Sequence, residues 1–147
     1  MERDTMEQRI REFVEQPVWA VVGYSENRRK YGHLILHDLR SSGYVVFPVN
    51  RRGGEMDGMK VYPSVGELPI APGVVNIVIP PEQTLQVVRE CRAAGLLRVW
   101  MQPGAESEEA IEYCRENAIQ AVYHACAMVE KSLMGRGPRR SGGQIPG

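Results

Sequence analysis

The stretch VWAVVG, residues 18–23, decides the fold of this 147-residue chain. It is an uninterrupted apolar run that ends at a glycine, and such runs are typical of strands buried on both faces of a parallel sheet. Comparable apolar runs follow at residues 44–48, 74–79, 97–101 and 121–123. We therefore expect a sheet of short, buried, parallel strands.

Helical patterns separate these strands. Thr5 and Gln8 fit a capping box at the start of a helix over residues 5–16, which Pro17 ends. The remaining expected elements are helices over 32–42, 82–94 and 107–117 and a short strand over 60–62. Alternation of strand and helix predicts an α/β fold, a Rossmann-like doubly wound parallel sheet in three α/β/α layers. We expect the strand order 3-2-1-4-5-6, with a ligand crevice at the carboxyl ends of the first and fourth strands.

The composition predicts one domain with terminal additions. Hydrophobic residues make up 43% of the chain and charged residues 24%, which is ordinary for a globular domain with one core. We expect residues 1–17 to form an N-terminal helix packed on the domain and residues 18–134 to form the domain itself. Residues 135–147 are rich in Gly, Pro and Arg and are expected to be a disordered basic tail.

Charge and hydropathy argue against nucleic-acid and membrane partners. The formal net charge is zero, and the three arginines of the tail leave the preceding residues with a charge of −3. Such a body lacks the broad positive field that phosphate backbones require. No apolar run approaches the roughly 20 residues that span a membrane. The charged start MERDTMEQRI has no apolar core of a secretory signal.

The three cysteines, Cys91, Cys114 and Cys126, are odd in number and lack CxxC spacing. This pattern argues against a disulfide framework and against a structural zinc site. We therefore expect a reducing, cytoplasmic compartment.

The segment GYSENRRKYG, residues 23–32, joins the first strand to the next helix. In dinucleotide-binding folds this connection holds a pyrophosphate, because glycine lets the backbone approach and the helix N-terminus supplies N–H groups. The segment is longer and more basic than the GxGxxG fingerprint of NAD sites, which is absent. The alternative interpretation is a tight turn at Gly23 followed by a solvated run of charge.

Asn50, Arg51 and Arg52 follow the second strand, where NAD-binding domains place an Asp or Glu for the ribose diol. A carboxylate repels a phosphorylated ribose, whereas arginine binds phosphate oxygens in a bidentate manner. The pattern therefore favours a ribose phosphate, as in coenzyme A or NADP. Solvated loop arginines are the alternative.

Five motifs in order resemble a known family. They are VVGYS at 21–25 with KYGH at 30–33, GYVVFPVN at 43–50, VIPPE at 78–82, VWMQPGA at 99–105 and CAMVE at 126–130. The chain resembles the small stand-alone CoA-binding proteins, which are similar to the N-terminal CoA-binding domain of the succinyl-CoA synthetase alpha subunit. The match runs from about Val18 to Leu133, so residues 18–134 are identified with this Rossmann-like domain.

The resemblance implies a set of CoA-binding positions. They are Gly23, Tyr24, Ser25, Lys30, Tyr31 and Gly32 at the diphosphate, Asn50 and Arg51 at the adenosine 3′-phosphate, Val78, Ile79 and Pro80 flanking adenine and pantetheine, and Gln102 at the pantetheine end. Two positions depart from the family pattern: Arg51 stands where proline is usual, and His124-Ala125 precede Cys126 where Asp-Arg is common.

The expected function is non-catalytic binding of CoA or an acyl-CoA through the loops after strands 1, 2 and 4. The spacing shows no catalytic constellation and no metal-ligand set, and His33 and His37 are interpreted as structural or solvent-facing. One alternative is a detached CoA-binding component of an NDP-forming acyl-CoA synthetase, which needs a separate partner. An NADP-binding oxidoreductase is disfavoured because GxGxxG is missing. A homo-oligomer is left open.

Two expectations concern single residues at the crevice. Gly23→Val is expected to abolish CoA binding while leaving the fold largely intact, because a branched side chain blocks backbone approach to the diphosphate. Cys126 follows the last strand and is expected to open toward the pantetheine arm, where it would form a mixed disulfide with CoA. The alternative is that Cys126 is a small buried hydrophobe.

Overall fold

A five-stranded parallel sheet forms the centre of the molecule, in the order β2-β1-β5-β6-β7. The computed structural model describes residues 4–135 and 138. The strands are β1 (Val18–Val22), β2 (Val45–Val49), β5 (Val74–Ile77), β6 (Arg98–Met101) and β7 (Gln120–Val122). Each lies on a segment where the apolar runs predict a strand.

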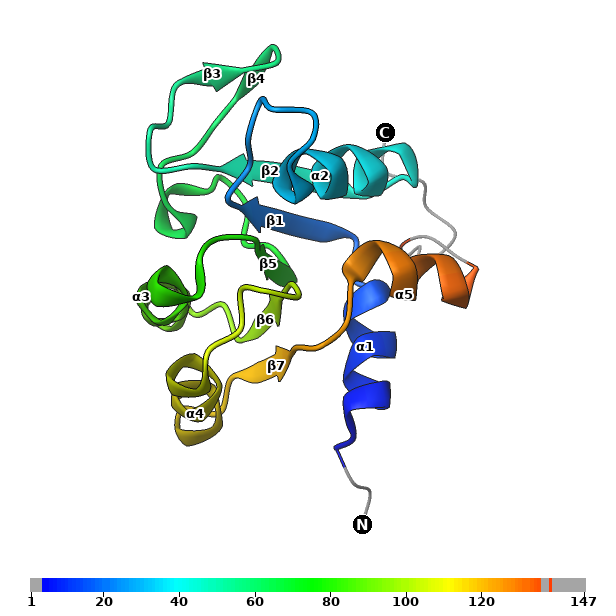
Figure 1. Cartoon of the computed structure of the whole chain (residues 1–147), viewed down its shortest axis with the longest axis vertical. Coiled ribbons are helices and arrows are strands. Elements are labelled where there is room, and N and C mark those ends of the chain that lie inside the picture. Colours follow the sequence, from blue (N-terminus) through cyan, green and yellow to red (C-terminus); the bar gives the residue numbers. More distant parts are fainter. Residues whose placement is uncertain (1–3, 136–137, 139–147) are drawn as a thin grey trace.

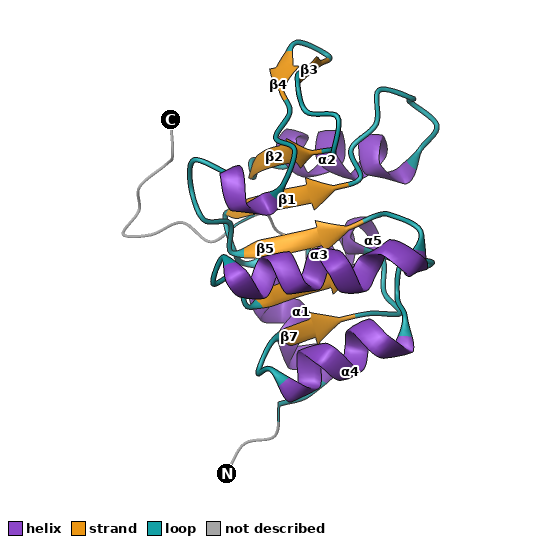
Figure 2. Ribbon diagram, turned by 90° about the vertical axis from the view of Figure 1, so that its left-hand side faces the viewer, coloured by secondary structure: helices purple, strands orange, loops and turns teal. Residues whose placement is uncertain are grey.

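Helices cover both faces of the sheet (Figures 1 and 2). They are α1 (Met6–Val14), α2 (Tyr31–Ser41), α3 (Pro81–Ala93), α4 (Glu108–Glu116) and α5 (Ala127–Met134), with a short 3₁₀ turn η1 (Val65–Glu67). Helices α3 and α4 lie on one face, and α1, α2 and α5 lie on the other. The three-layer, Rossmann-like α/β/α fold is therefore confirmed.

Two apolar clusters, one on each face, hold the layers together. The face under α3 and α4 is aliphatic, whereas the opposite face contains Phe13, Trp19 and Trp100. The rings of Trp19 and Trp100 lie 5.7 Å apart, and both side chains are almost completely buried. All four residues of β5 are buried, as expected for a central parallel strand.

The predicted third strand differs in the structure. β4 (Met59–Lys60) pairs antiparallel with β3 (Glu55–Met56) in a separate hairpin, and only Tyr62 forms a parallel bridge to Val49 beside β2. The cause is the dipeptide Asp57-Gly58, which has φ of 51° and 76°. Two successive positive φ angles form the type I′ turn that closes a two-residue hairpin. The order 3-2-1-4-5-6 thus holds for five strands, and the third is reduced to one bridge.

The N-terminal helix packs on the domain. Thr5 and Gln8 form the expected capping box, and Phe13 and Val14 of α1 are buried. Arg9 donates from Nη1 to the carbonyl of Ala121, 2.9 Å away, and so ties α1 to β7. None of the described helices has the length and apolar character needed to cross a membrane. Apart from residues 135 and 138, the expected tail over 135–147 lies outside the described residues.

Candidate functional site

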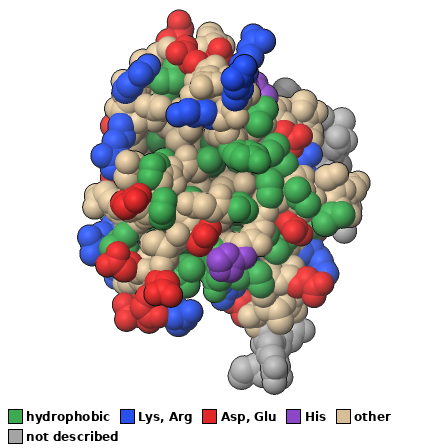
Figure 3. Space-filling model, in the orientation of Figure 1, with side chains coloured by type: hydrophobic (Ala, Val, Ile, Leu, Met, Phe, Trp, Pro, Cys, Tyr) green, Lys and Arg blue, Asp and Glu red, His purple; other side chains and the backbone are tan. Residues whose placement is uncertain are grey.

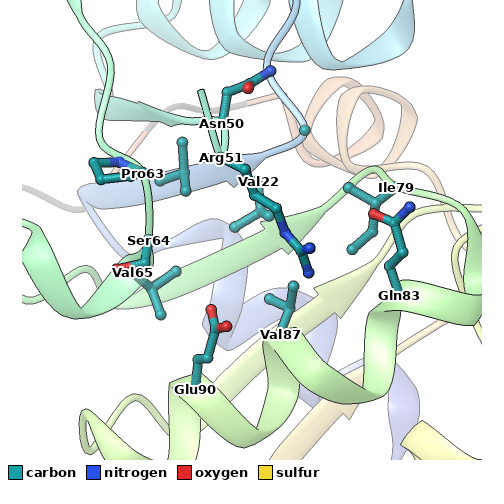
Figure 4. Close-up of a pocket in the computed structure, with 12 residues that line it drawn as sticks. Val22, Asn50, Arg51, Pro63, Ser64, Val65, Ile79, Gln83, Val87 and Glu90 are labelled. Carbon is teal, nitrogen blue, oxygen red and sulfur yellow. The ribbon is translucent and has the colours of Figure 1, made fainter. Parts of the chain in front are cut away.

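A cleft of about 500 Å³ opens at the carboxyl ends of β1, β2 and β5 (Figure 4). Its lining residues are Val22, Gly23, Val49, Asn50, Arg51, Pro63, Ser64, Val65, Ile79, Gln83, Val87 and Glu90. β1 is flanked by β2 on one side and by β5 on the other, so the chain changes direction across this point of the sheet. Ligands of open α/β sheets bind at such switch points, and the predicted crevice is present.

Arg51 directs its side chain into the cleft. Figure 4 shows the guanidinium group above Val87, with Ile79 to one side. Glu90 of α3 also lines the cleft. Arg51 and Glu90 are the titratable side chains among the lining residues. The remaining walls are largely aliphatic, so the guanidinium group of Arg51 lies next to an apolar surface. This combination suits a flat apolar ring that carries an anionic group nearby.

Asn50 connects the two loops that frame the cleft. Its Nδ2 donates to the carbonyl of Tyr24, 2.8 Å away, and its Oδ1 accepts from the backbone N–H of Arg52 at 2.9 Å. In Figure 4 the Asn50 side chain points away from the Arg51 guanidinium. Asn50 therefore positions the loops after β1 and β2 with the same side chain that the resemblance assigns to the 3′-phosphate.

Gly23 is required by backbone packing within the protein. Its φ is +104°, and a Cβ atom there would lie 2.1 Å from the carbonyl oxygen of Val78. Gly32 is equally constrained, because its Cβ would lie 2.2 Å from the carbonyl oxygen of Gly23. The end of β1, the start of α2 and the end of β5 thus meet at van der Waals distance. The expectation that Gly23→Val spares the fold is corrected, since valine would collide with the protein's own backbone.

The other residues of the first loop lie beside the cleft rather than on its walls. Tyr24 is fully buried, and its hydroxyl donates to Asp57 and lies 3.1 Å from Nε2 of His37. Burial, followed by the bond to Asp57, raises the pKa of Tyr24. The Ser25 carbonyl lies 3.0 Å from Nδ1 of His33. The outer positions, Lys30 and Tyr31, are exposed at the N-terminus of α2.

Basic side chains gather near this loop. Figure 3 shows lysine and arginine side chains at the upper end of the molecule, around the β3–β4 hairpin and the loop before α2. Arg28, Arg29 and Lys30 are exposed there. They supply positive charge next to the N-terminus of α2, a combination that favours anions.

The remaining predicted residues occupy different surroundings. The Val78 N–H donates to the carbonyl of Val22 at 2.8 Å, and Pro80 is the exposed N-cap of α3. Gln102 is only 4% exposed, and its Oε1 accepts from Nδ2 of Asn76 at 3.2 Å and from the N–H of Ala127 at 2.8 Å. Gln102 is therefore an internal link between β5, β6 and α5.

The structure brings together Gly23, Asn50, Arg51 and Ile79 from the predicted set. Eight further lining residues were not in the predicted set, namely Val22, Val49, Pro63, Ser64, Val65, Gln83, Val87 and Glu90. The last three recur at helical spacing on α3, and this spacing after the β5 loop was the available signal. The segment from Pro63 carried no comparable pattern.

The cysteines differ in their surroundings. Cys91 and Cys114 are buried, and burial raises the pKa of each thiol to about 12, so both are poorly reactive. Cys126 is half-buried at the N-cap of α5. It is not among the residues that line the cleft.

A family model described as a CoA binding domain matches residues 17–132 of the chain. The match covers every strand and the whole cleft. The chain belongs to the CoA-binding domain family.

Relatives of this CoA-binding domain fall into two groups. An uncharacterized protein of Bacillus subtilis, YneT, is 28% identical over 114 residues, which cover 78% of this chain and 84% of that protein. The subunit alpha of acetate–CoA ligase [ADP-forming] I from Pyrococcus furiosus is 37% identical over 83 residues, which cover 52% of this chain. The chain spans only 18% of that ligase subunit.

The same architecture is found in a protein of solved structure. It is a conserved hypothetical protein from Pyrococcus furiosus with 45% sequence identity and a TM-score of 0.73. The similarity covers 76% of this chain and 97% of that chain.

Proposed function

We propose that this protein binds coenzyme A or an acyl-CoA in the cleft, without catalysing a reaction by itself. The observation that carries the proposal is the Arg51 guanidinium, which extends into the switch-point cleft of a CoA-binding domain. A cleft of about 500 Å³ lies within the range of sites that hold a small-molecule ligand or a large part of one.

The cleft offers a separate contact for each part of the adenosine end. The aliphatic walls at Val22, Ile79 and Val87 fit the faces of an adenine ring, and Arg51 matches the 3′-phosphate. The N-terminus of α2, with Gly32 packed against Gly23, lies where the diphosphate of such folds is bound. The proposal of binding without catalysis is supported by the lining residues, whose titratable side chains are Arg51 and Glu90.

Calorimetric titration with CoA, dephospho-CoA, NADP and NAD tests the proposal. We expect CoA to bind with one site per chain and dephospho-CoA to bind about ten- to hundredfold more weakly, the value of a charge-assisted contact. Binding of NADP in preference to CoA would overturn the proposal, and equal affinity for CoA and dephospho-CoA would remove the role of Arg51.

A second function is favoured by the acetate–CoA ligase relatives. In this alternative the chain is a detached CoA-binding component of an NDP-forming acyl-CoA synthetase. Affinity purification of the tagged protein from its native cells, followed by assay of the complex with acid, ATP and CoA, separates the two. Acyl-CoA formation that requires both the chain and a co-purified partner supports the synthetase component, whereas CoA binding without turnover supports the stand-alone function.

A further inference from the structure

His33, His37 and Asp57 form a cluster outside the cleft. The two histidines lie one turn apart on α2, and their ring centroids are 4.3 Å apart. Asp57 comes from the type I′ turn of the β3–β4 hairpin. One ring nitrogen of each histidine and one carboxylate oxygen of Asp57 all lie within 4.8 Å of one another.

We propose that His33, His37 and Asp57 bind a divalent transition metal ion, with zinc as the best match. Two imidazoles select zinc-like ions over magnesium and calcium, which prefer sites made entirely of oxygen ligands. Three protein ligands leave a fourth coordination position for water. The ion would join α2 to the hairpin and hold the hairpin against the body of the protein.

The cluster needs only a small contraction to hold the ion. Zinc–ligand bonds of about 2.0–2.2 Å place tetrahedral ligand atoms about 3.3 Å apart. The widest pair must therefore close by about 1.5 Å from its present limit of 4.8 Å. Nδ1 of His33 already lies 3.7 Å from Oδ2 of Asp57. His37 and Asp57 are exposed and His33 is half-buried, so solvent reaches the site and side-chain rotation supplies the closure.

The hydroxyl of Tyr24 orients one of the three proposed ligands. The buried hydroxyl of Tyr24 donates to Asp57, the kind of outer hydrogen bond that orients a metal-binding carboxylate. Coordination through Nδ1 of His33 replaces its bond to the Ser25 carbonyl, whereas coordination through Nε2 retains it.

The histidine spacing alone did not predict this site. Both histidines lie on the first helix after the sheet's first strand, and the sequence analysis interprets them as structural or solvent-facing. Asp57 lies on a different element, and only the hairpin brings its carboxylate to α2.

Titration of the tag-free, chelator-treated protein with zinc chloride tests the proposal in the absence of CoA. We expect one zinc ion per chain by calorimetry, and bound cobalt(II) with the visible absorption of a nitrogen- and oxygen-ligated site, without thiolate charge transfer. His37→Gln and Asp57→Asn should each weaken zinc binding at least tenfold. His124→Gln removes the histidine outside the cluster and Cys126→Ser the half-buried thiol, so both are matched controls that should bind as the wild type.

A second readout follows the hairpin. Saturating zinc should slow hydrogen exchange of the amides of residues 54–61 in the wild type and in His124→Gln, but not in Asp57→Asn. Melting curves in chelator establish that each variant is folded, and Asp57→Asn lies on an exposed turn where it should not disturb the core. Absence of zinc binding, or its loss in His124→Gln or Cys126→Ser instead of the cluster variants, would overturn the proposal. CoA binding is measured separately, so the two proposals succeed or fail independently.

Discussion

Arg51 is the cation that the end of β2 places in the cleft. Arg51→Gln should lower CoA affinity about ten- to hundredfold, because one charge-assisted phosphate contact contributes about 1.5–3 kcal/mol. The affinity for dephospho-CoA should change little, so the preference for CoA should disappear. Calorimetric titration of both ligands measures this difference.

Arg52→Gln is the matched control for Arg51. Arg52 is an exposed neighbour of the same charge and is not among the lining residues of the cleft. We expect it to retain the preference for CoA. An equal loss in both variants would show that only the general positive charge of the loop matters.

Gly23 stabilises the fold as well as shaping the site. Gly23→Ala should lower the free energy of unfolding by about 3 kcal/mol or more, because the new Cβ meets the Val78 carbonyl and φ stays at +104°. Gly95→Ala separates the two causes: Gly95 also has positive φ, at +75°, but nothing within 4 Å of a Cβ. Gly95→Ala should therefore lower the free energy of unfolding by only about 1–2 kcal/mol, the cost of a left-handed backbone conformation for a residue with a Cβ atom. Denaturant unfolding compares them, and equal losses would contradict the close-contact argument.

At the scale of elements, Gln102 connects β6 to the first turn of α5 and to β5. Gln102→Leu keeps the volume but leaves the N–H of Ala127 and the amide of Asn76 without their acceptor. We expect the free energy of unfolding to fall by about 2–4 kcal/mol, the cost of stranding two buried donors. Urea unfolding of the variant measures the loss.

Gln86→Leu provides the reference for that measurement. Gln86 lies on the exposed side of α3, so the same substitution should change stability by no more than about 0.5 kcal/mol. If both variants unfold alike, the Gln102 hydrogen bonds do not contribute to holding α5.

For the whole molecule, a ligand held by β1, β2 and β5 together should stabilise the native state as one unit. CoA at one hundred times its Kd should add about 2.7 kcal/mol to the free energy of unfolding. For a chain of this size the melting temperature should rise by roughly 5–10 °C. Differential scanning fluorimetry with the buried Trp19 and Trp100 as reporters measures the shift.

Dephospho-CoA at the same concentration should produce a smaller shift, because Arg51 has no phosphate to contact. A shift of equal size with both ligands would place the phosphate outside the cleft. If Arg51→Gln retains the full rise in melting temperature with CoA, the phosphate also lies outside the cleft.

The sequence by itself determined the layered fold. Apolar runs that are continuous rather than alternating are typical of strands covered on both faces, and residues 18–22 and 74–77 form such strands in the structure. The same local logic predicted the capping box of Thr5 and the crevice beyond Gly23 and Arg51. Each of these features depends on a few residues that are close in the sequence, and a local sequence pattern can therefore predict it.

Only the tertiary structure decided which groups meet across elements. The Asp57-Gly58 turn diverted the expected third strand into a hairpin and brought Asp57 to His33 and His37. The fold also places the amide of Gln102, a predicted ligand residue, between β5 and α5. Long-range contacts such as these depend on the relative positions of several helices and strands. Local periodicity in the sequence does not predict those positions. For this reason the strands and the crevice could be read from the sequence, whereas the partners of Tyr24, Asp57 and Gln102 could not.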